Sequence, residues 1–283
     1  MIKKISIVCI VLFTTTIYAQ EKTTENPSNW KKNGTVTFLF NQSAFKNWQA
    51  GGVNNIAGNL SLNYDFNYAK NNWTWDNKII ASYGLTKLKD QGTKKTDDRL
   101  EFNSLVGKKS KGFWYYSGFL NFKTQMSSTD VGGVQQSHFF SPAYLQFGPG
   151  MLWKKSNNLK INIAPATSKL VMVHSHFTEN LAIGSSYFGV DPNKTTRYEF
   201  GVALNGYYKL ELLKNVSMEN ILNLYSNYLD KPGNIDLDYT VNFVMKINKY
   251  MSTNVTIQAI YDDNAIKALQ TKEVFGLGVN YIF

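Results

Sequence analysis

Strict two-residue alternation of apolar and polar side chains runs through most of this 283-residue chain. Between Ile56 and Tyr68, one face carries large apolar side chains and the other carries asparagine, serine and Asp65. The stretch Ile235–Ile247 repeats this pattern. Successive side chains of a β-strand point to opposite sides, whereas a helix repeats every 3.6 residues. No stretch of comparable length has a helical period, so the chain is predicted to be all-β.

Twelve segments carry the alternation and are predicted to be strands. They are residues 35–46, 55–69, 73–86, 98–108, 113–126, 142–153, 159–167, 196–210, 216–228, 235–247, 251–262 and 273–283. Short connections (69–72, 108–112, 154–158, 212–216 and 248–250) alternate with longer ones (47–54, 87–97, 127–141, 168–195, 229–234 and 263–272). An even number of strands with short turns at one end and long loops at the other is typical of outer-membrane barrels. We therefore expect residues 34–283 to form an antiparallel transmembrane β-barrel of about twelve strands.

The first nineteen residues are typical of an export signal. Two lysines precede an apolar run from Ile5 to Phe13, and Ala19 offers a small residue at the cleavage point. This run is too short to cross a bilayer as a helix. We therefore expect a cleaved signal peptide over residues 1–19, followed by a polar periplasmic lead-in over residues 20–33.

The composition fits an exported membrane protein. Cys9, the only cysteine, lies in the signal, so the exported chain has no disulfide and its stability must come from the fold. Removal of the signal leaves 28 basic and 20 acidic residues, a formal charge of +8. An exported protein rarely meets nucleic acid, so the expected partners are outer-membrane lipid, lipopolysaccharide, the barrel assembly machinery and an unidentified envelope protein. Aromatic residues make up 14% of the chain, which suits strands and interfacial girdles.

A soluble β-sandwich or lipocalin-like barrel is the alternative fold. A sandwich needs fewer than twelve strands, and its connections would not alternate in length. Charged side chains also lie deep within the predicted strands, on the face opposite to the apolar one. In a transmembrane barrel this face lines the lumen, and the lumen-lining candidates are Asp65, Lys78, Arg99, Glu101, Lys123, Arg197, Glu199, Glu219 and Asp238. Such a lumen would either line a narrow water channel or be closed by ion pairs.

The final stretch, GLGVNYIF, keeps the alternation to its last residue. It resembles the C-terminal signal that the barrel assembly machinery recognises, with a terminal phenylalanine, an aromatic residue two positions earlier and apolar residues at the preceding alternate positions. The residues that fit are Phe275, Leu277, Val279, Tyr281 and Phe283. We expect this strand to close the barrel against the first strand and to leave no free edge.

Six stretches carry a resemblance to a known family. They are NQSAFKNWQAGGVNNIAGNLSLNYDFNY, WTWDNKIIASYGLTK, KKTDDRLEFNS, WYYSGFLNFKTQ, YFGVDPNKTTRYEFG and IYDDN. Together they resemble the DUF3078 family of Bacteroidota-type outer-membrane proteins, and NW-x-x-GG and TDDR are the most specific parts. The resemblance implies an outer-membrane location and a β-barrel, but no activity and no catalytic residues.

The three histidines are the candidates for metal binding. In an extended segment, His174 and His176 would lie on one side, and a third ligand would come from His138, Glu179 or Asp191. No motif of fixed spacing accompanies them, so exposed loop histidines are the simpler interpretation. We therefore expect neither a metal site nor a cofactor.

A surface hydrolase is the enzymatic alternative. Outer-membrane phospholipases also have twelve strands and a Ser-His-Asn group, but Ser175 and the histidines beside it would face opposite ways on a strand. Barrel proteases would need carboxylates near a histidine at the extracellular rim. The rim carboxylates are Asp97, Asp98, Asp262 and Asp263, which are more simply loop residues or a weak divalent-cation site that bridges lipopolysaccharide. We expect no enzymatic activity.

The sequence leaves three functions open. The first is a passive channel or uptake pore for small solutes. The second is a structural or adaptor barrel that serves an envelope complex through its long loops, and the third is the surface hydrolase. The state of the lumen, open or filled, distinguishes the first function from the other two.

Overall fold

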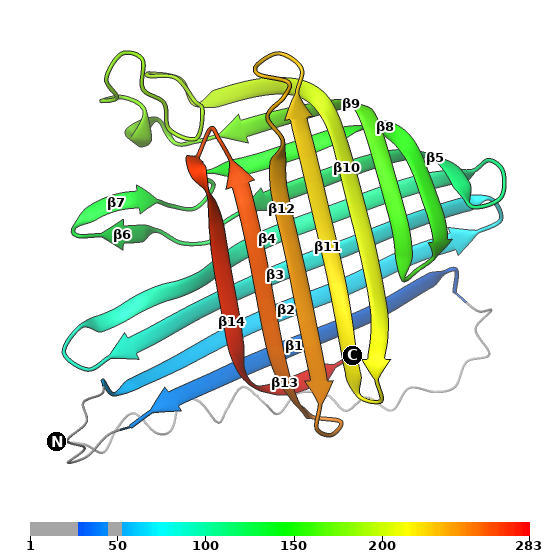
Figure 1. Cartoon of the computed structure of the whole chain (residues 1–283), viewed down its shortest axis with the longest axis horizontal. Helices are drawn as coiled ribbons and strands as arrows, with labels where there is room; N and C mark the ends of the chain where they lie inside the picture. The colour runs from blue at the N-terminus through cyan, green and yellow to red at the C-terminus, as the bar shows by residue number, and fades with distance from the viewer. Residues whose placement is uncertain (1–27, 45–52) are drawn as a thin grey trace.

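Twelve antiparallel strands close into a barrel (Figure 1). The computed structural model describes residues 28–44 and 53–283. The barrel strands are β1 (Trp30–Ser43), β2 (Asn55–Lys70), β3 (Trp73–Leu88), β4 (Gly92–Lys109), β5 (Trp114–Thr124), β8 (Ala143–Ser156), β9 (Leu159–Met172), β10 (Thr196–Leu213), β11 (Val216–Asn227), β12 (Asp236–Lys246), β13 (Met251–Asp262) and β14 (Ile266–Ile282). Consecutive strands are neighbours, β5 pairs with β8, and β14 pairs with β1. The predicted all-β barrel is confirmed.

The alternation places apolar side chains outside the barrel and polar side chains inside it. Phe38 of β1 and Phe275 of β14 are 46% and 57% exposed, whereas Glu101 of β4 is 2% exposed. Large exposed apolar surfaces are rare on monomeric proteins that are surrounded by water. This distribution is that of an outer-membrane β-barrel, whose outer face is apolar and whose interior is polar.

Aromatic rings gather where the short turns join the strands. The ring centroid of Trp30 lies 5.3 Å from that of Tyr68 and 5.7 Å from that of Trp75. At the same end of the barrel, Trp114 of β5 is opposite Trp153 of β8. Tryptophan and tyrosine favour the boundary between lipid and water, so these rings form the kind of girdle that flanks a membrane-spanning band.

The seam between β1 and β14 is shorter than the other edge of β1. The ladder joins residues Thr35–Phe40 to Leu277–Ile282, and Gly34 and Phe283 exchange two further backbone hydrogen bonds of 2.7 and 3.0 Å. The ladder between β1 and β2, in contrast, includes the whole of β1. Within the described residues, the first half of β14 therefore pairs only with β13.

Three strands begin earlier than the sequence predicted. β1 begins at Trp30, so residues 30–33 are not part of a lead-in, because they pair with the end of β2. β4 begins at Gly92 and β14 at Ile266, so the predicted loops 87–97 and 263–272 are tight turns between long strands. Polar residues obscured these strand ends, since a strand beyond the membrane needs a backbone ladder but no apolar face.

Part of the predicted organisation lies outside the described residues. This applies to the signal peptide over residues 1–19, to the start of the lead-in, and to the NW-x-x-GG motif at Asn47–Gly52. The TDDR motif lies within β4, where Arg99 points into the lumen. None of the helical segments in residues 28–44 and 53–283 has the length and hydrophobicity of a membrane-crossing helix.

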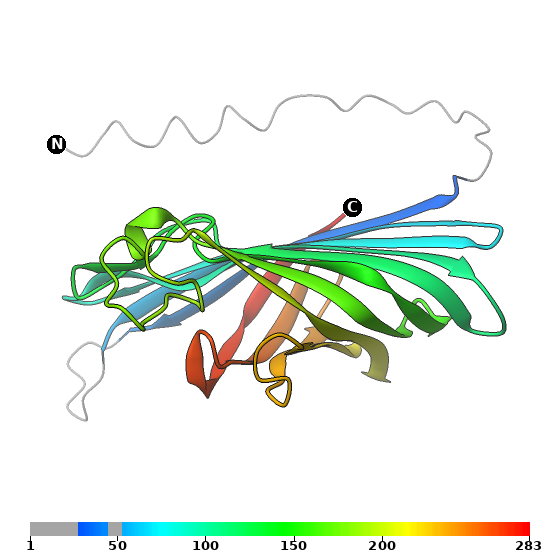
Figure 2. The ribbon, with the colours of Figure 1, turned by 90° about the horizontal axis from the view of Figure 1, so that it is seen from above.

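The longer connections gather at one end of the barrel, opposite the turn between β4 and β5 (Figure 2). The β5–β8 connection holds a hairpin that was not predicted, β6 (Thr129–Val131) paired with β7 (Val134–Ser137). Gly132 and Gly133 between them have φ angles of 61° and 82°, which glycine adopts without strain. The β9–β10 connection contains a short 3-10 turn, η2 (Ser175–Phe177).

Candidate functional site in the barrel lumen

Two cavities lie inside the barrel, one toward each end. The inner chamber, on the short-turn side, has a volume of about 290 Å³, and the β8–β9 turn contributes to its wall. The outer chamber, on the loop side, has a volume of about 680 Å³, and residues 186–188 of the β9–β10 connection contribute to its wall. Asn121 and Asn223 line both cavities, so the two chambers adjoin.

A packed apolar cluster lies where the chambers meet. Phe119, Ala164, Ala203 and Tyr225 are 8% exposed or less, and Leu105 packs against them. Phe119 and Leu105 also line the inner chamber, whereas Tyr225 lines the outer one. Side chains of the barrel strands therefore narrow the lumen at this level.

An ion pair crosses the bore in the inner chamber. Lys78 Nζ of β3 lies 3.3 Å from Glu219 Oε1 of β11. These strands are six places apart in the closed order of twelve, so the two side chains come from opposite walls. Asp65 Oδ1 lies 3.5 Å from the same ammonium, and the hydroxyl of Tyr207 donates a 2.8 Å hydrogen bond to Glu219.

A second ion pair crosses the lumen at the outer chamber. It joins Lys123 of β5 to Asp238 of β12, which are five places apart in the strand order. Gln258 donates a 2.8 Å hydrogen bond to the other oxygen of Asp238. Nearby, Arg99 Nε donates a 2.9 Å hydrogen bond to Glu101 Oε2. Each buried carboxylate therefore has a specific partner.

A third group of charges lies closer to the loops. Glu199 is 1% exposed and pairs with Arg197 Nε at 3.0 Å and with Lys169 Nζ at 3.3 Å. Lys169 also pairs with Asp236 at 2.7 Å, and its Nζ lies 4.8 Å from the ring centroid of Tyr225. All nine lumen residues proposed from the sequence thus take part in ion pairs with other groups of the barrel.

The sequence reading missed part of this charge network. Asp76 accepts hydrogen bonds of 2.8 Å from both Lys154 and Lys160. Its position two residues before Lys78 would have placed it on the same inward face. Lys154 was assigned to a turn, because the predicted strand ended before it, whereas β8 continues to Ser156.

The loops pack together over the outer chamber. The hydroxyl of Tyr187, from the β9–β10 connection, donates a 2.6 Å hydrogen bond to the carbonyl of Gln136 in β7. The ring of Tyr187 stacks on Phe177 with centroids 4.7 Å apart. Burial raises the pKa of Tyr187 to about 12, so its hydroxyl remains a donor throughout the physiological range. We call these two packed connections, residues 125–142 and 173–195, the outer lid.

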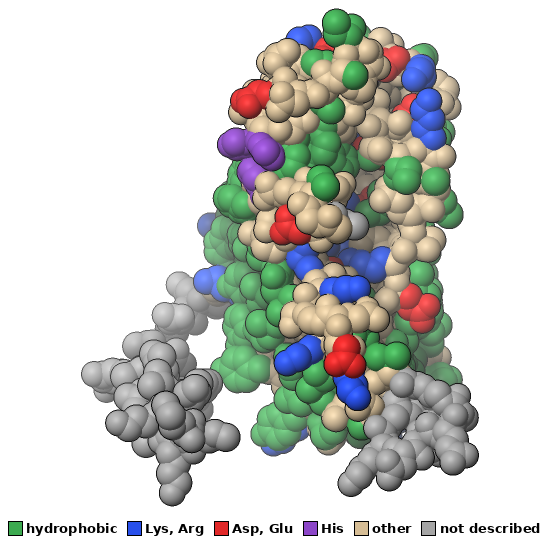
Figure 3. Space-filling view, turned by 90° about the vertical axis from the view of Figure 1, so that its left-hand side faces the viewer, with side chains coloured by type: hydrophobic (Ala, Val, Ile, Leu, Met, Phe, Trp, Pro, Cys, Tyr) green, Lys and Arg blue, Asp and Glu red, His purple; other side chains and the backbone are tan. Residues whose placement is uncertain are grey.

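Two of the three histidines meet in the outer lid. The ring centroids of His138 and His174 are 4.8 Å apart, although the residues come from different connections. His176 lies in the 3-10 turn, not on an extended segment, and its backbone N–H donates to His174 Nδ1 at 3.2 Å. This bond engages one of the two ring nitrogens of His174. Histidine side chains, shown in purple, gather at one edge of the face in Figure 3.

The other groups proposed for metal binding or catalysis have different roles or positions. Asp191 pairs with Lys194 at 2.9 Å, and the hydrogen bond from Lys194 lowers the pKa of this exposed carboxyl. The side chain of Glu179 makes no bond to a histidine in the described part of the chain. No hydrogen bond joins the hydroxyl of Ser175 to a histidine within residues 53–283.

The rim carboxylates fall into separate groups. Asp97 pairs with Lys272 at 2.8 Å, and Asp98 pairs with Lys95 at 2.7 Å. Asp98 also accepts backbone hydrogen bonds from the connection that follows β5. These two residues are therefore held in ion pairs in the first half of β4, toward the loop end of the barrel.

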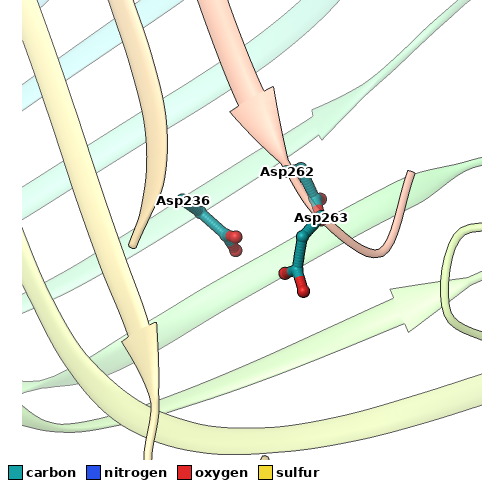
Figure 4. A group of neighbouring side chains, drawn as sticks. All are labelled: Asp236, Asp262 and Asp263. Carbon is teal, nitrogen blue, oxygen red and sulfur yellow. The ribbon is translucent and has the colours of Figure 1, made fainter. Parts of the chain in front are cut away.

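The remaining rim carboxylates, Asp262 and Asp263, meet Asp236 where β13 ends and β12 begins (Figure 4). Carboxylate oxygens of Asp236, Asp262 and Asp263 lie within 4.8 Å of one another. Lys169 pairs with Asp236, and Lys231 lies 3.8 Å from Asp263. Lysines of the chain thus partly neutralise this acidic group.

Comparison with known proteins gives a family match and distant structural likenesses. Residues 40–129 match the model for "Protein of unknown function (DUF3078)", which confirms the resemblance over that part of the chain. No curated protein matches the sequence.

Three solved structures are similar in outline. The COG4313 outer membrane channel from Pseudomonas putida F1 has 10% identity and a TM-score of 0.38, with 91% of this chain and 96% of that chain covered. The translocator domain of autotransporter NalP from Neisseria meningitidis has 9% identity and a TM-score of 0.36, with 92% and 90% covered. The beta domain of the Bordetella autotransporter BrkA has 11% identity and a TM-score of 0.32, with 90% and 99% covered. Likenesses at this level do not transfer a function to the chain.

Proposed function

We propose that this protein is an integral outer-membrane barrel that acts as a narrow pore for small polar solutes. The apolar outer face and the aromatic girdle support insertion into a lipid bilayer. Export through a cleaved signal peptide and insertion by the barrel assembly machinery belong to the same proposal, as does the absence of catalysis.

The observation that carries the proposal is the pair of adjoining chambers along the lumen. Their volumes, about 290 and 680 Å³, leave space for water and small solutes on both sides of the apolar cluster. The constriction consists of side chains such as Phe119 and Tyr225, so a substitution there can widen it without altering the strand ladder. Twelve strands give a bore between the filled eight-stranded barrels and the open porins. A small conductance is therefore expected.

Single-channel recording in planar lipid bilayers tests this function. The purified full chain is expected to give small discrete current steps. Phe119→Ala removes an aromatic ring from the constriction and should increase the step size, whereas Phe139→Ala, an exposed loop substitution, should not. Lys78→Met should shift the ion selectivity toward cations, because the lumen loses a positive charge. The absence of steps in both the native chain and Phe119→Ala would contradict the pore.

A second function, an adaptor barrel for an envelope complex, is favoured by one surface feature. The outer loops expose large apolar side chains, with Ile183 fully exposed, Leu229 at 66% and Val134 at 61%. Exposed apolar side chains on loops outside the lipid-facing wall are available to contact a partner protein. If the adaptor function holds, envelope proteins should copurify in mild detergent and be lost when residues 129–137 or 179–192 are shortened. Unchanged copurification would contradict it.

A further inference from the structure

We infer that the inner chamber is a binding site for a neutral, hydroxyl-rich solute of about the size of one sugar ring. The inference names a substrate class for the proposed pore and rests on that function only for transport, because binding can be measured separately. Three features of the chamber support it: its amides, its charge balance and its apolar patch.

Amide side chains dominate the chamber wall. Ten of its twenty-two lining residues are asparagines. Several face one another across adjacent strands, with Asn121 donating to Asn103 at 2.6 Å and Asn205 donating to Asn223 at 3.0 Å. An amide offers two N–H donors and two acceptor lone pairs, so one or two bonds do not use its full capacity. Sugar hydroxyls both donate and accept, and therefore match such a wall.

Four of the five charged residues that line the chamber are in ion pairs, and the fifth, Lys209, is exposed, which disfavours an ionic ligand inside the chamber. Asp76 is held by Lys154 and Lys160, and Lys78 is held by Asp65 and Glu219. An added cation or anion would have to lose its hydration and compete with one of these pairs. A neutral solute avoids both costs.

The size and the apolar patch of the chamber fit a sugar ring. A volume of about 290 Å³ is near the lower end of small-molecule sites, which begin at roughly 300 Å³. Leu105, Phe119 and Ile221 form an apolar part of the wall. The C–H face of a sugar ring can pack on such a surface while its hydroxyls reach the amides.

Calorimetric titration of the purified full chain in detergent tests the inference with four probes of similar size. Glucose and N-acetylglucosamine are neutral, glucosamine is cationic and glucuronate is anionic. We expect the two neutral sugars to bind and the two charged ones to bind roughly tenfold more weakly, since the charge must be desolvated. Equal or tighter binding of a charged probe, or no binding of any probe, would overturn the inference.

Two substitutions locate the binding. Asn205→Leu removes an amide from the wall and should weaken glucose binding about fivefold, the usual value of a lost hydrogen bond or two. Asn63→Leu changes an inward asparagine of β2 outside the chamber wall and should leave binding unchanged. Equal loss in both variants would contradict the site. If glucose binds but the chain gives no conductance, the pore function is overturned and the binding site stands. If the chain conducts but binds no sugar, the binding site is overturned and the pore function stands.

Discussion

The aromatic ring of Phe283 lies over Gly34 of β1, so close that a Cβ atom on residue 34 would be 2.3 Å from the ring Cζ. The same ring stacks on Tyr64 of β2 with centroids 5.8 Å apart. The backbones of Gly34 and Phe283 are joined by two hydrogen bonds. Glycine at position 34 is therefore what allows the ring to cover the seam.

Replacing this glycine should weaken barrel closure. In Gly34→Ala the added methyl group displaces the ring of Phe283 and disturbs its stacking on Tyr64. We expect a loss of about 1–3 kcal/mol in the free energy of unfolding, as for other overpacked sites. Thermal unfolding followed by circular dichroism in detergent measures the change. Gly118→Ala is the control, because its Cβ would meet only Val106 at 3.5 Å, and equal melting temperatures for the two variants would refute the prediction.

Removal of the C-terminal ring should impair assembly more than any activity. Phe283 combines the seam contacts with the last position of the expected assembly signal. We expect deletion of Phe283 to lower the amount of protein in the outer-membrane fraction, measured by immunoblot after fractionation. Phe139→Ala, in an exposed loop, serves as the control. Normal outer-membrane levels of the deletion variant would count against this role.

The ion pair that crosses the lumen should stabilise the barrel cooperatively. In Lys78→Met, the partly buried Glu219 loses its countercharge, and we expect a destabilisation of about 3 kcal/mol, as for other broken buried pairs. The double variant with Glu219→Gln should be less destabilised than the sum of the single variants, with a coupling energy of about 1–2 kcal/mol. Denaturant unfolding in lipid vesicles gives all four values. Additive effects would show that the pair contributes nothing across the lumen.

The outer lid should depend on the hydroxyl of Tyr187. Tyr187→Phe removes the bond to Gln136 but keeps the ring that stacks on Phe177. We expect faster proteolysis of the connections around it, with the barrel strands unaffected. Tyr228→Phe, which removes a hydroxyl outside the lid, is the matched control. Equal proteolysis rates in the two variants would show that the bond does not hold the lid.

The same residue should make the lid sensitive to alkaline pH. Burial raises the pKa of Tyr187 to about 12, above the value of about 10 for a free tyrosine. The closed lid therefore holds the proton more tightly than the open one. The stability that the Tyr187 phenol contributes to the closed lid is present in full below pH 10 and is lost as the pH rises through about 12. A difference absorbance titration of the native chain against Tyr187→Phe should show one phenol that titrates near pH 12, and a midpoint near 10 would contradict the burial.

The sequence predicted the barrel well because a membrane imposes alternation on every spanning strand. β2 and β3 were located within two residues at each end, since apolar residues such as Leu62 and Ile79 must face lipid. The predicted ends were wrong where strands leave the membrane, as at Gly92 and Ile266. There the ladder continues through polar residues, and nothing in the side chains marks it.

The candidate site was predictable only as a set of inward residues. Alternation places Lys78 and Glu219 on the lumen face, but it does not show that they meet, because that depends on the strand order and the register of a closed barrel. The contact between His138 and His174 had no sequence signal, since it depends on the fold of two loops. The Gly132–Gly133 turn could have been recognised from its glycines, but the prediction treated residues 127–141 only as one long connection.

The short seam has a mechanical consequence. A closed ring of strands under tension separates where two neighbouring strands share the shortest ladder. Here that place is the pairing of Thr35–Phe40 with Leu277–Ile282, whereas β1 is paired with β2 along its whole length. Thermal or pulling forces on the wall should therefore open the ring at one defined place. The whole tube would then unroll from that place as a sheet, and its closure during assembly would be the same event in reverse.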